Sequence, residues 1–255
     1  MTSPSNYEFI GISGSGKSTL AKTAVRNIPD ARAARDVYFE SVMDGPAKNI
    51  MPLLLRLPGK IGRNVLRAYP RLRNRPVYSY HNFATEYPDF AQTVEQIIEE
   101  IEVDDHDRVR RLLIRRAVHY GAIKDEDSSI VFDEGFAMGA VSMFSRRNDE
   151  PEKRLVDQYM NVVPLPRILV HVDVRPEVGY QRARRRPEGL PSSMKKLSEY
   201  SRKKRFATMA KCVSTVGKLA EERGLTVVRI DNTGSLSNTK LTLIRELNSL
   251  ARNQS

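Results

Sequence analysis

The residues best suited to chemistry lie in one short run near the start of the chain. Positions 11–18 read Gly-Ile-Ser-Gly-Ser-Gly-Lys-Ser, which fits the pattern G-x-x-x-x-G-K-[ST] in full. Glycines let consecutive backbone N–H groups turn toward one point, because no Cβ stands between them and a bound anion. A helix that begins at such a loop adds the positive end of its dipole. The pattern therefore predicts a Walker A loop that binds the phosphates of a nucleoside triphosphate.

The residue types within this loop predict separate roles. We expect Lys17 to reach the β- and γ-phosphates, and we expect the Ser18 hydroxyl to be a ligand of Mg²⁺. Further nucleotide contacts should come from the loop and the first helical turn after it. The expected binding residues are Gly11, Ser13, Gly14, Ser15, Gly16, Lys17, Ser18 and Thr19. The predicted cofactors are ATP, or another nucleoside triphosphate, and Mg²⁺.

A second candidate is a carboxylate that ends an apolar run. Residues 130–133 read Ile-Val-Phe-Asp, and an acid beside the phosphate loop can hold Mg²⁺ through water or accept a proton from the substrate. Asp133 is therefore a predicted metal ligand and catalytic residue, with Glu134 as a less favoured partner. On the acceptor side, Asp36 could deprotonate a hydroxyl and Arg35 could hold an anionic acceptor. The choice between Asp133 and Asp36 as general base stays open.

Five short apolar segments are predicted to be the strands that carry these residues. They cover residues 7–10, 31–34, 129–132, 167–172 and 226–230. Helical periodicity lies between them, over residues 18–27, 88–103, 104–120, 150–162, 198–223 and 236–251. Alternation of this kind predicts a parallel sheet covered on both faces, with ligands beyond the carboxyl ends of the strands. We therefore expect the α/β class, as a three-layer α/β/α P-loop NTPase with a five-stranded parallel sheet.

The chain is predicted to form one domain over residues 1–255, with a helical insertion at residues 41–128 on the substrate side. The first part of this insertion is rich in proline and interrupts the alternation of strands and helices. Residues 58–69 are expected to form an amphipathic helix, either a surface helix or one that binds a phosphorylated or polymeric acceptor, nucleic acid or a membrane surface. The residues on its basic face are Lys60, Arg63 and Arg67.

Composition narrows the classes of ligand and the cellular compartment that we expect. The chain has 255 residues and a net charge of +11, which attracts polyanions such as nucleotides, phosphosugars, nucleic acid or anionic lipid. Its single cysteine, Cys212, cannot form an intrachain disulfide and fits a reducing compartment. No secretory signal and no long apolar run is present, so we expect a cytoplasmic protein without a transmembrane segment. The four histidines lack metal-ligand spacing, and no zinc site is expected.

Four segments resemble the nucleoside and nucleotide kinase group of P-loop proteins, the thymidylate kinase-like and adenylate kinase-like families. They are the glycine loop at residues 11–18, Val-Phe-Asp-Glu-Gly-Phe at 131–136, the stretch from Val-His-Val-Asp to Arg-Arg-Arg at 170–186, and Val-Val-Arg-Ile-Asp-Asn-Thr-Gly-Ser-Leu at 227–236. The chain lacks the Asp-Arg-Tyr of thymidylate kinases and the complete Asp-Gly-Phe-Pro-Arg of adenylate kinases. The resemblance therefore supports the reaction type better than it supports a particular acceptor.

This resemblance implies an ATP-dependent phosphotransferase that moves the γ-phosphoryl group to a hydroxyl or phosphate of a small-molecule acceptor. It also implies an Arg-rich lid at about residues 182–200. Arg182 and Arg186 would then contact the transferred group, since arginine stays protonated and offers bidentate contacts to phosphate. Asn232 falls in the loop on the adenine side and is expected to contact the nucleotide.

Two other functions fit the same residues. A nucleic-acid end kinase would hold phosphates with the basic face of residues 58–69 and the arginines of residues 108–116, and its affinity would fall steeply with salt. A regulatory ATPase or GTPase would hydrolyse its nucleotide without an acceptor. The chain holds no guanine-type Asn-Lys-x-Asp, and the arginine cluster favours transfer to an acceptor. The sequence does not decide between ATP and GTP, identify the acceptor or predict an oligomeric state.

Overall fold

The computed structural model describes residues 6–42, 75–101, 106–145, 152–187 and 189–253. Five strands in these residues form one parallel sheet, in the order β2-β3-β1-β4-β5. The strands are β1 (Tyr7–Ile10), β2 (Ala31–Ala33), β3 (Ser129–Phe132), β4 (Ile168–Asp173) and β5 (Thr226–Asp231). The predicted α/β class with a five-stranded parallel sheet is confirmed.

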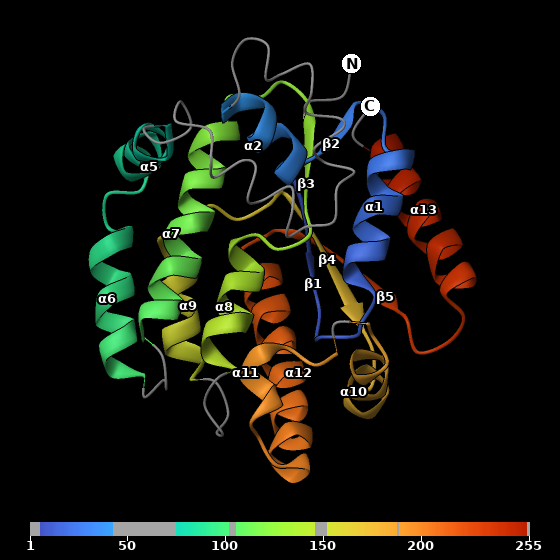
Figure 1. Ribbon diagram of the computed structural model, residues 1–255. Coiled ribbons are helices and arrows are strands. Elements are labelled where there is room, and N and C mark those ends of the chain that lie inside the picture. Colours follow the sequence, from blue (N-terminus) through green and yellow to red (C-terminus); the bar gives the residue numbers. More distant parts are fainter. Residues whose placement is uncertain (1–5, 43–74, 102–105, 146–151, 188, 254–255) are drawn as a thin grey trace.

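Helices cover both faces of the sheet (Figure 1). The helices α1 (Lys17–Asn27) and α13 (Leu236–Asn253) lie together on one face. The remaining helices are α2 (Ala34–Val42), α5 (Arg75–Glu86), α6 (Phe90–Glu100), α7 (His106–Ile123), α8 (Phe136–Phe144), α9 (Lys153–Asn161), α10 (Pro176–Arg184), α11 (Ser192–Lys195) and α12 (Glu199–Glu222). Of these, α7, α8, α9 and α12 cover the opposite face, so the predicted three-layer arrangement is confirmed.

The apolar core of the described residues lies in three clusters, and the two larger ones lie on opposite sides of the central strand β1. Successive side chains of a strand face opposite sides of the sheet. Phe9 therefore packs with Leu20 of α1 and Leu243 of α13, whereas Ile10 belongs to the larger cluster on the α8 and α12 side. Burial of this kind supplies most of the stabilisation of an α/β domain. It also fixes the carboxyl end of β1, where the glycine loop begins.

Five helices, α2, α5, α8, α10 and α11, lie outside the ranges in which helical periodicity was found, although α5 falls within the helical insertion predicted at residues 41–128. Helix α8 reads Phe-Ala-Met-Gly-Ala-Val-Ser-Met-Phe and is almost entirely buried, so it has no polar face to reveal a helical period. Helix α5 contains Pro76 in its first turn, where proline is tolerated. The predicted helix at residues 58–69 lies outside the described residues. None of the described helices is long and apolar enough to cross a bilayer.

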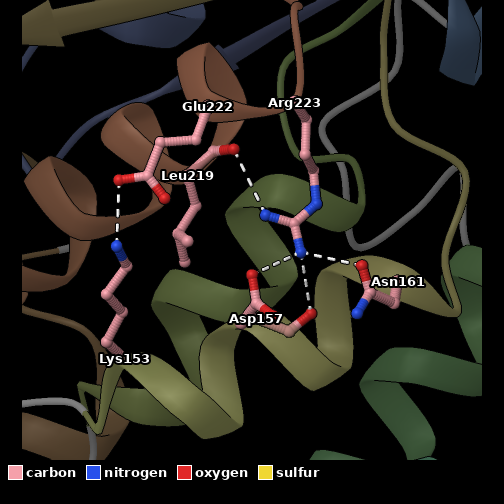
Figure 2. Close-up of polar contacts among 6 residues, drawn as sticks. All are labelled: Lys153, Asp157, Asn161, Leu219, Glu222 and Arg223. Carbon is pink, nitrogen blue, oxygen red and sulfur yellow. Dashed lines mark hydrogen bonds and ion pairs between the residues drawn. The ribbon is translucent and has the colours of Figure 1, made fainter.

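A polar clamp holds the end of α12 on α9 (Figure 2). Arg223, which follows α12, donates to the backbone oxygen of Asp157 at 3.1 Å and to its Oδ1 at 2.6 Å. It also donates to Asn161 Oδ1 at 2.8 Å and to the Leu219 carbonyl at 3.2 Å. The clamp fixes α12, whose first half reaches the candidate site.

Candidate active site

The glycine loop joins β1 to α1 at the carboxyl edge of the sheet. Gly14 and Gly16 have φ angles of +82° and +87°, a left-handed conformation that favours glycine. A Cβ on Gly14 would lie 2.1 Å from the carbonyl oxygen of Gly179, so the loop packs directly against α10. Helix α1 begins at Lys17 and receives no side-chain cap from the described residues. The N–H groups of Ser15 and Thr19 donate to the carbonyls of Ile12 and Gly16. A phosphate can bind to the other N–H groups of the loop and of the helix start.

Lys17 is electrostatically coupled to the two acids that follow β3. Burial lowers the pKa of Lys17, Glu134 opposes this effect, and Arg186 lowers the pKa further. Burial raises the pKa of Asp133, the neighbouring charge of Glu134 adds to this effect, and Lys17 opposes it. These mutual effects require the four groups to be close together. Clustered groups with perturbed pKa values are typical of active sites.

A cavity of about 560 Å³ opens beside these groups. Five of its lining residues were predicted to bind nucleotide: Ser13, Gly16, Lys17, Ser18 and Thr19. Glu134 and Arg186 also line it, together with side chains of α7, α8 and α12. A hollow of this size, with polar groups on one wall and Met138 and Met209 on another, has the character of a small-molecule site.

A smaller cavity of about 120 Å³ adjoins the first at the ends of β2 and β3. The two share Leu112, Arg116 and Glu134 in their walls. The smaller cavity is also lined by Asp133, and by Arg35 from the start of α2. The structure therefore brings Asp133, Glu134 and Arg35 to one hollow, as the strand ends predicted.

The wall of the smaller cavity that α2 and α7 form is rich in positive charge. Arg115 and Arg116 line the smaller cavity with Arg35. Arg116 donates from Nε to the Gly135 carbonyl at 2.8 Å and from Nη1 to the Leu112 carbonyl at 3.3 Å. Burial and the charges of Arg115 and Arg116 lower the pKa of the neighbouring His119 to about 4. The positive charge of this wall suits an anionic ligand.

Asp36 is not among the residues that line either cavity. It lies in the first turn of α2 and accepts a hydrogen bond from Arg35 Nε at 3.3 Å. Strand β2 ends at Ala33, and the chain enters α2 at once. The direction of the Asp36 side chain is therefore set by a helix, and not by the end of a strand. Its role as general base stays a prediction.

Arg182 and Asn232 support the glycine loop from the side of β5. Arg182 lies in α10 and donates to three carbonyl oxygens, those of Asn232 at 2.6 Å, Thr233 at 3.3 Å and Gly234 at 3.2 Å. Asn232 is buried, and its Nδ2 donates to the Ser15 carbonyl at 2.6 Å. Arg182 is not among the residues that line the larger cavity, whereas Arg186 is. The predicted contact of Arg182 with the transferred phosphoryl group stays a prediction.

Sequence reasoning missed Glu8 and gave no separate role to Arg116. Glu8 interrupts the apolar strand Tyr-Glu-Phe-Ile and is only 2% exposed. A charged residue in the middle of a buried strand is rare and was the available signal. Arg116 stood within a run of basic residues on α7, and only the packing of α7 on α8 shows that it reaches the turn after β3.

The residues at the loop fit a nucleotide with Mg²⁺. The glycines leave an open cradle of N–H groups, and the Ser18 hydroxyl and Asp133 carboxylate are the hard oxygen ligands that Mg²⁺ prefers. Within the described residues, no group of three or more His, Cys, Asp or Glu could hold a metal ion. An Mg²⁺ ion at this site would therefore also need phosphate oxygens as ligands.

Comparison with solved structures identifies the fold. No protein-family model and no curated protein matches the chain. The deoxyadenosine kinase of M. mycoides with bound dATP is 15% identical, with a TM-score of 0.53 over 96% of this chain and 99% of that chain. The thymidylate kinase of Candida albicans is 11% identical, with a TM-score of 0.50 over 100% of this chain and 95% of that chain. The chain therefore has the fold of the P-loop nucleoside and nucleotide kinases.

Proposed function

We propose that the protein is a kinase that moves the γ-phosphoryl group of ATP, or of another nucleoside triphosphate, to a small-molecule acceptor in the two adjoining cavities. The observation that carries the proposal is the presence of Lys17, Glu134 and Arg186 in the wall of one cavity of about 560 Å³. Phosphates bound at the loop alone would not account for the walls of this cavity that α7, α8 and α12 form. The hollow leaves room for an acceptor next to the γ-phosphate.

The residues of the site have distinct parts in this reaction. The Lys17 ammonium group donates hydrogen bonds to the β- and γ-phosphates, and their negative charge favours its protonated form. Arg186 offsets charge that develops on the transferred group. Ser18 and Asp133 would hold Mg²⁺, which neutralises charge on the phosphates when it is bound. Where the acceptor is a hydroxyl, Glu134 can take its proton, because Glu134 lines both cavities.

The charge around the smaller cavity supports an acceptor with an anionic group. Arg35, Arg115 and Arg116 line this cavity together with only two acids, Asp133 and Glu134. Both acids lie on the side of the phosphate loop, where Mg²⁺ and Lys17 would offset their charge. The arginines are then left to bind a phosphate or carboxylate of the acceptor.

The test is to incubate the protein with Mg-ATP and pooled nucleosides, nucleotides, phosphosugars, neutral sugars and oligonucleotides. Mass spectrometry would then search for a product heavier by one phosphate. We expect a product from an anionic small molecule, and transfer should fall about 100-fold or more in Lys17→Ala. Lys22→Ala, which changes an exposed lysine of the same helix, is the matched control. Normal turnover in Lys17→Ala, or ATP hydrolysis that no acceptor accelerates, would contradict the proposal.

A further inference from the structure

Glu8 stands at the centre of the sheet, three positions before the glycine loop begins. Tyr7 and Phe9 belong to the cluster that contains α1 and α13, so Glu8 faces the opposite side, toward α8. A carboxylate buried in such a place is costly unless fixed donors replace the water that it loses. The structure supplies these donors from a single element.

The donors are the first N–H groups of α8. Glu8 Oε1 accepts the N–H of Met138 at 2.6 Å, and Oε2 accepts the N–H of Ala137 at 3.1 Å. Gly135 occupies the N-cap position, and no cap hydrogen bond comes from its own turn. Strand β1 therefore provides, from a distant part of the sequence, the carboxylate that the start of α8 lacks.

The turn that enters α8 is the one that carries the site acids. Asp133 and Glu134 directly precede Gly135. A Cβ on Gly135 would lie 2.5 Å from Glu8 Oε2, so the carboxylate lies against the turn itself. Arg116 of α7 donates to the Gly135 carbonyl at 2.8 Å. The turn is thus bound to β1 through Glu8 and to α7 through Arg116.

We propose that Glu8 is a positioning residue that fixes the turn at residues 133–135 relative to the glycine loop, so that Asp133 and Glu134 face Lys17. Glu8 touches neither nucleotide nor acceptor, and it acts through the turn. The inference rests on the proposed kinase function. A merely structural cap would affect stability alone, whereas a positioning residue must also affect turnover while nucleotide binding at the loop is retained.

Glu8→Gln tests this difference, because it keeps the size of the side chain but replaces one acceptor oxygen with an NH₂ group. The control is Tyr159→Phe, which removes the hydrogen bond from the Tyr159 hydroxyl to the Phe136 carbonyl at 3.2 Å. That bond lies at the start of the same helix, and neither its donor nor its acceptor belongs to β1. We expect Glu8→Gln to lower kcat about 10- to 100-fold with the KM for Mg-ATP within about twofold. Tyr159→Phe should keep both values.

Hydrogen exchange provides a second measurement that does not need turnover. In Glu8→Gln, the amides of Ala137 and Met138 should exchange faster than in the wild type, while the amides of the glycine loop keep their protection. Unchanged exchange at Ala137 and Met138 would overturn the proposal even if the wild type transferred no phosphate. If the wild type transferred no phosphate, the proposed kinase function would be wrong, whatever the exchange rates at Ala137 and Met138.

If the wild type is active, two kinetic outcomes overturn the proposal. One is a wild-type kcat in Glu8→Gln, and the other is an equal loss of kcat in Glu8→Gln and Tyr159→Phe. If Glu8→Gln does not fold, Gly135→Ala tests the same contact, since its new Cβ would displace the Glu8 carboxylate. It should lower kcat and retain the KM for Mg-ATP, and an unchanged kcat would count against the proposal.

Discussion

Glu8→Gln should also change the way in which stability depends on pH. Burial raises the pKa of Glu8 in the folded protein from 4.5 to about 7, although the N–H groups of Met138 and Ala137 and the charge of Arg116 oppose this effect. Between these two pH values the folded chain holds a proton that the unfolded chain has released. The free energy of unfolding therefore falls as pH rises. A difference of about 2.5 pH units, at about 1.36 kcal/mol each, amounts to about 3 kcal/mol.

His119 produces a trend of the opposite sign. Burial, helped by Arg115 and Arg116, lowers its pKa from 6.5 to about 4. Between these values the unfolded chain binds a proton that the folded chain lacks, so stability rises with pH, again by about 3 kcal/mol. The two groups nearly cancel from about pH 4.5 to 6.5 in the wild type. Glu8→Gln removes one of them and should reveal the rise caused by His119, to which His171 adds because burial also lowers its pKa.

The assay is urea unfolding followed by far-UV circular dichroism, because the chain has no tryptophan for fluorescence. Measured from about pH 4.5 to 8, the stability of Glu8→Gln relative to the wild type should increase by about 3 kcal/mol. Glu99→Gln, an exposed change on α6, is the matched control and should show no such increase. A difference between Glu8→Gln and the wild type that stayed constant with pH would refute the reasoning.

Three further predictions concern Arg186, Arg223 and Gly14. Arg186→Ala should lower kcat about 100-fold with little change in nucleotide affinity, because Arg186 lines the larger cavity beside the phosphate loop. The control is Arg185→Ala, a change at its exposed neighbour. Equal steady-state rates for these two variants would argue against a role of Arg186 at the reacting phosphate. Arg223→Ala should cost about 1–2 kcal/mol in urea unfolding, because it removes the partly buried donor of the clamp in Figure 2 and its charge-assisted hydrogen bond to Asp157. Its control, Lys153→Ala, breaks the exposed ion pair with Glu222 in the same figure and should cost about 0.5 kcal/mol or less. Similar losses of stability in Arg223→Ala and Lys153→Ala would contradict the role given to the clamp. Gly14→Ala should abolish ATP binding in calorimetry, since its Cβ would lie 2.1 Å from a carbonyl oxygen of α10, and retained binding would show that the loop can adjust.

The sequence predicted the sheet and the glycine loop because both are local patterns. Each strand is a short apolar run, and the left-handed bends at Gly14 and Gly16 are encoded by the glycines themselves. Helix α8 was missed because it is buried on nearly every side, which removes the periodic signal on which helix prediction depends. The cavities were not predictable either, since their walls come from separate parts of the chain. The larger cavity is lined by the glycine loop, α7, α8 and α12, and the smaller one by α2, α7 and the turn after β3.

The different contacts of the arginines after β4 could not be predicted from the sequence either. Arg182 and Arg186 are four positions apart, and proximity in the chain suggested a common role. Helix α10 continues to Arg184, so Arg182 is fixed on the helix and its guanidinium group is directed at the carbonyls of residues 232–234. Arg186 lies beyond the helix and reaches the cavity. Because α10 ends at Arg184, Arg186 lines the larger cavity and Arg182 does not.

In the proposed kinase, the charges at the loop would make the magnesium–nucleotide complex a better ligand than the free nucleotide. Burial opposes the charged forms of both Lys17 and Asp133. A triphosphate offsets this effect at Lys17, but its negative charge would repel Asp133 and Glu134. An Mg²⁺ ion, which Ser18 and Asp133 would hold, would offset that repulsion and favour the ionised carboxylate. Nucleotide and metal each lower the cost of binding the other, so the positions of the two acids, which Glu8 and Arg116 fix through Gly135, affect both.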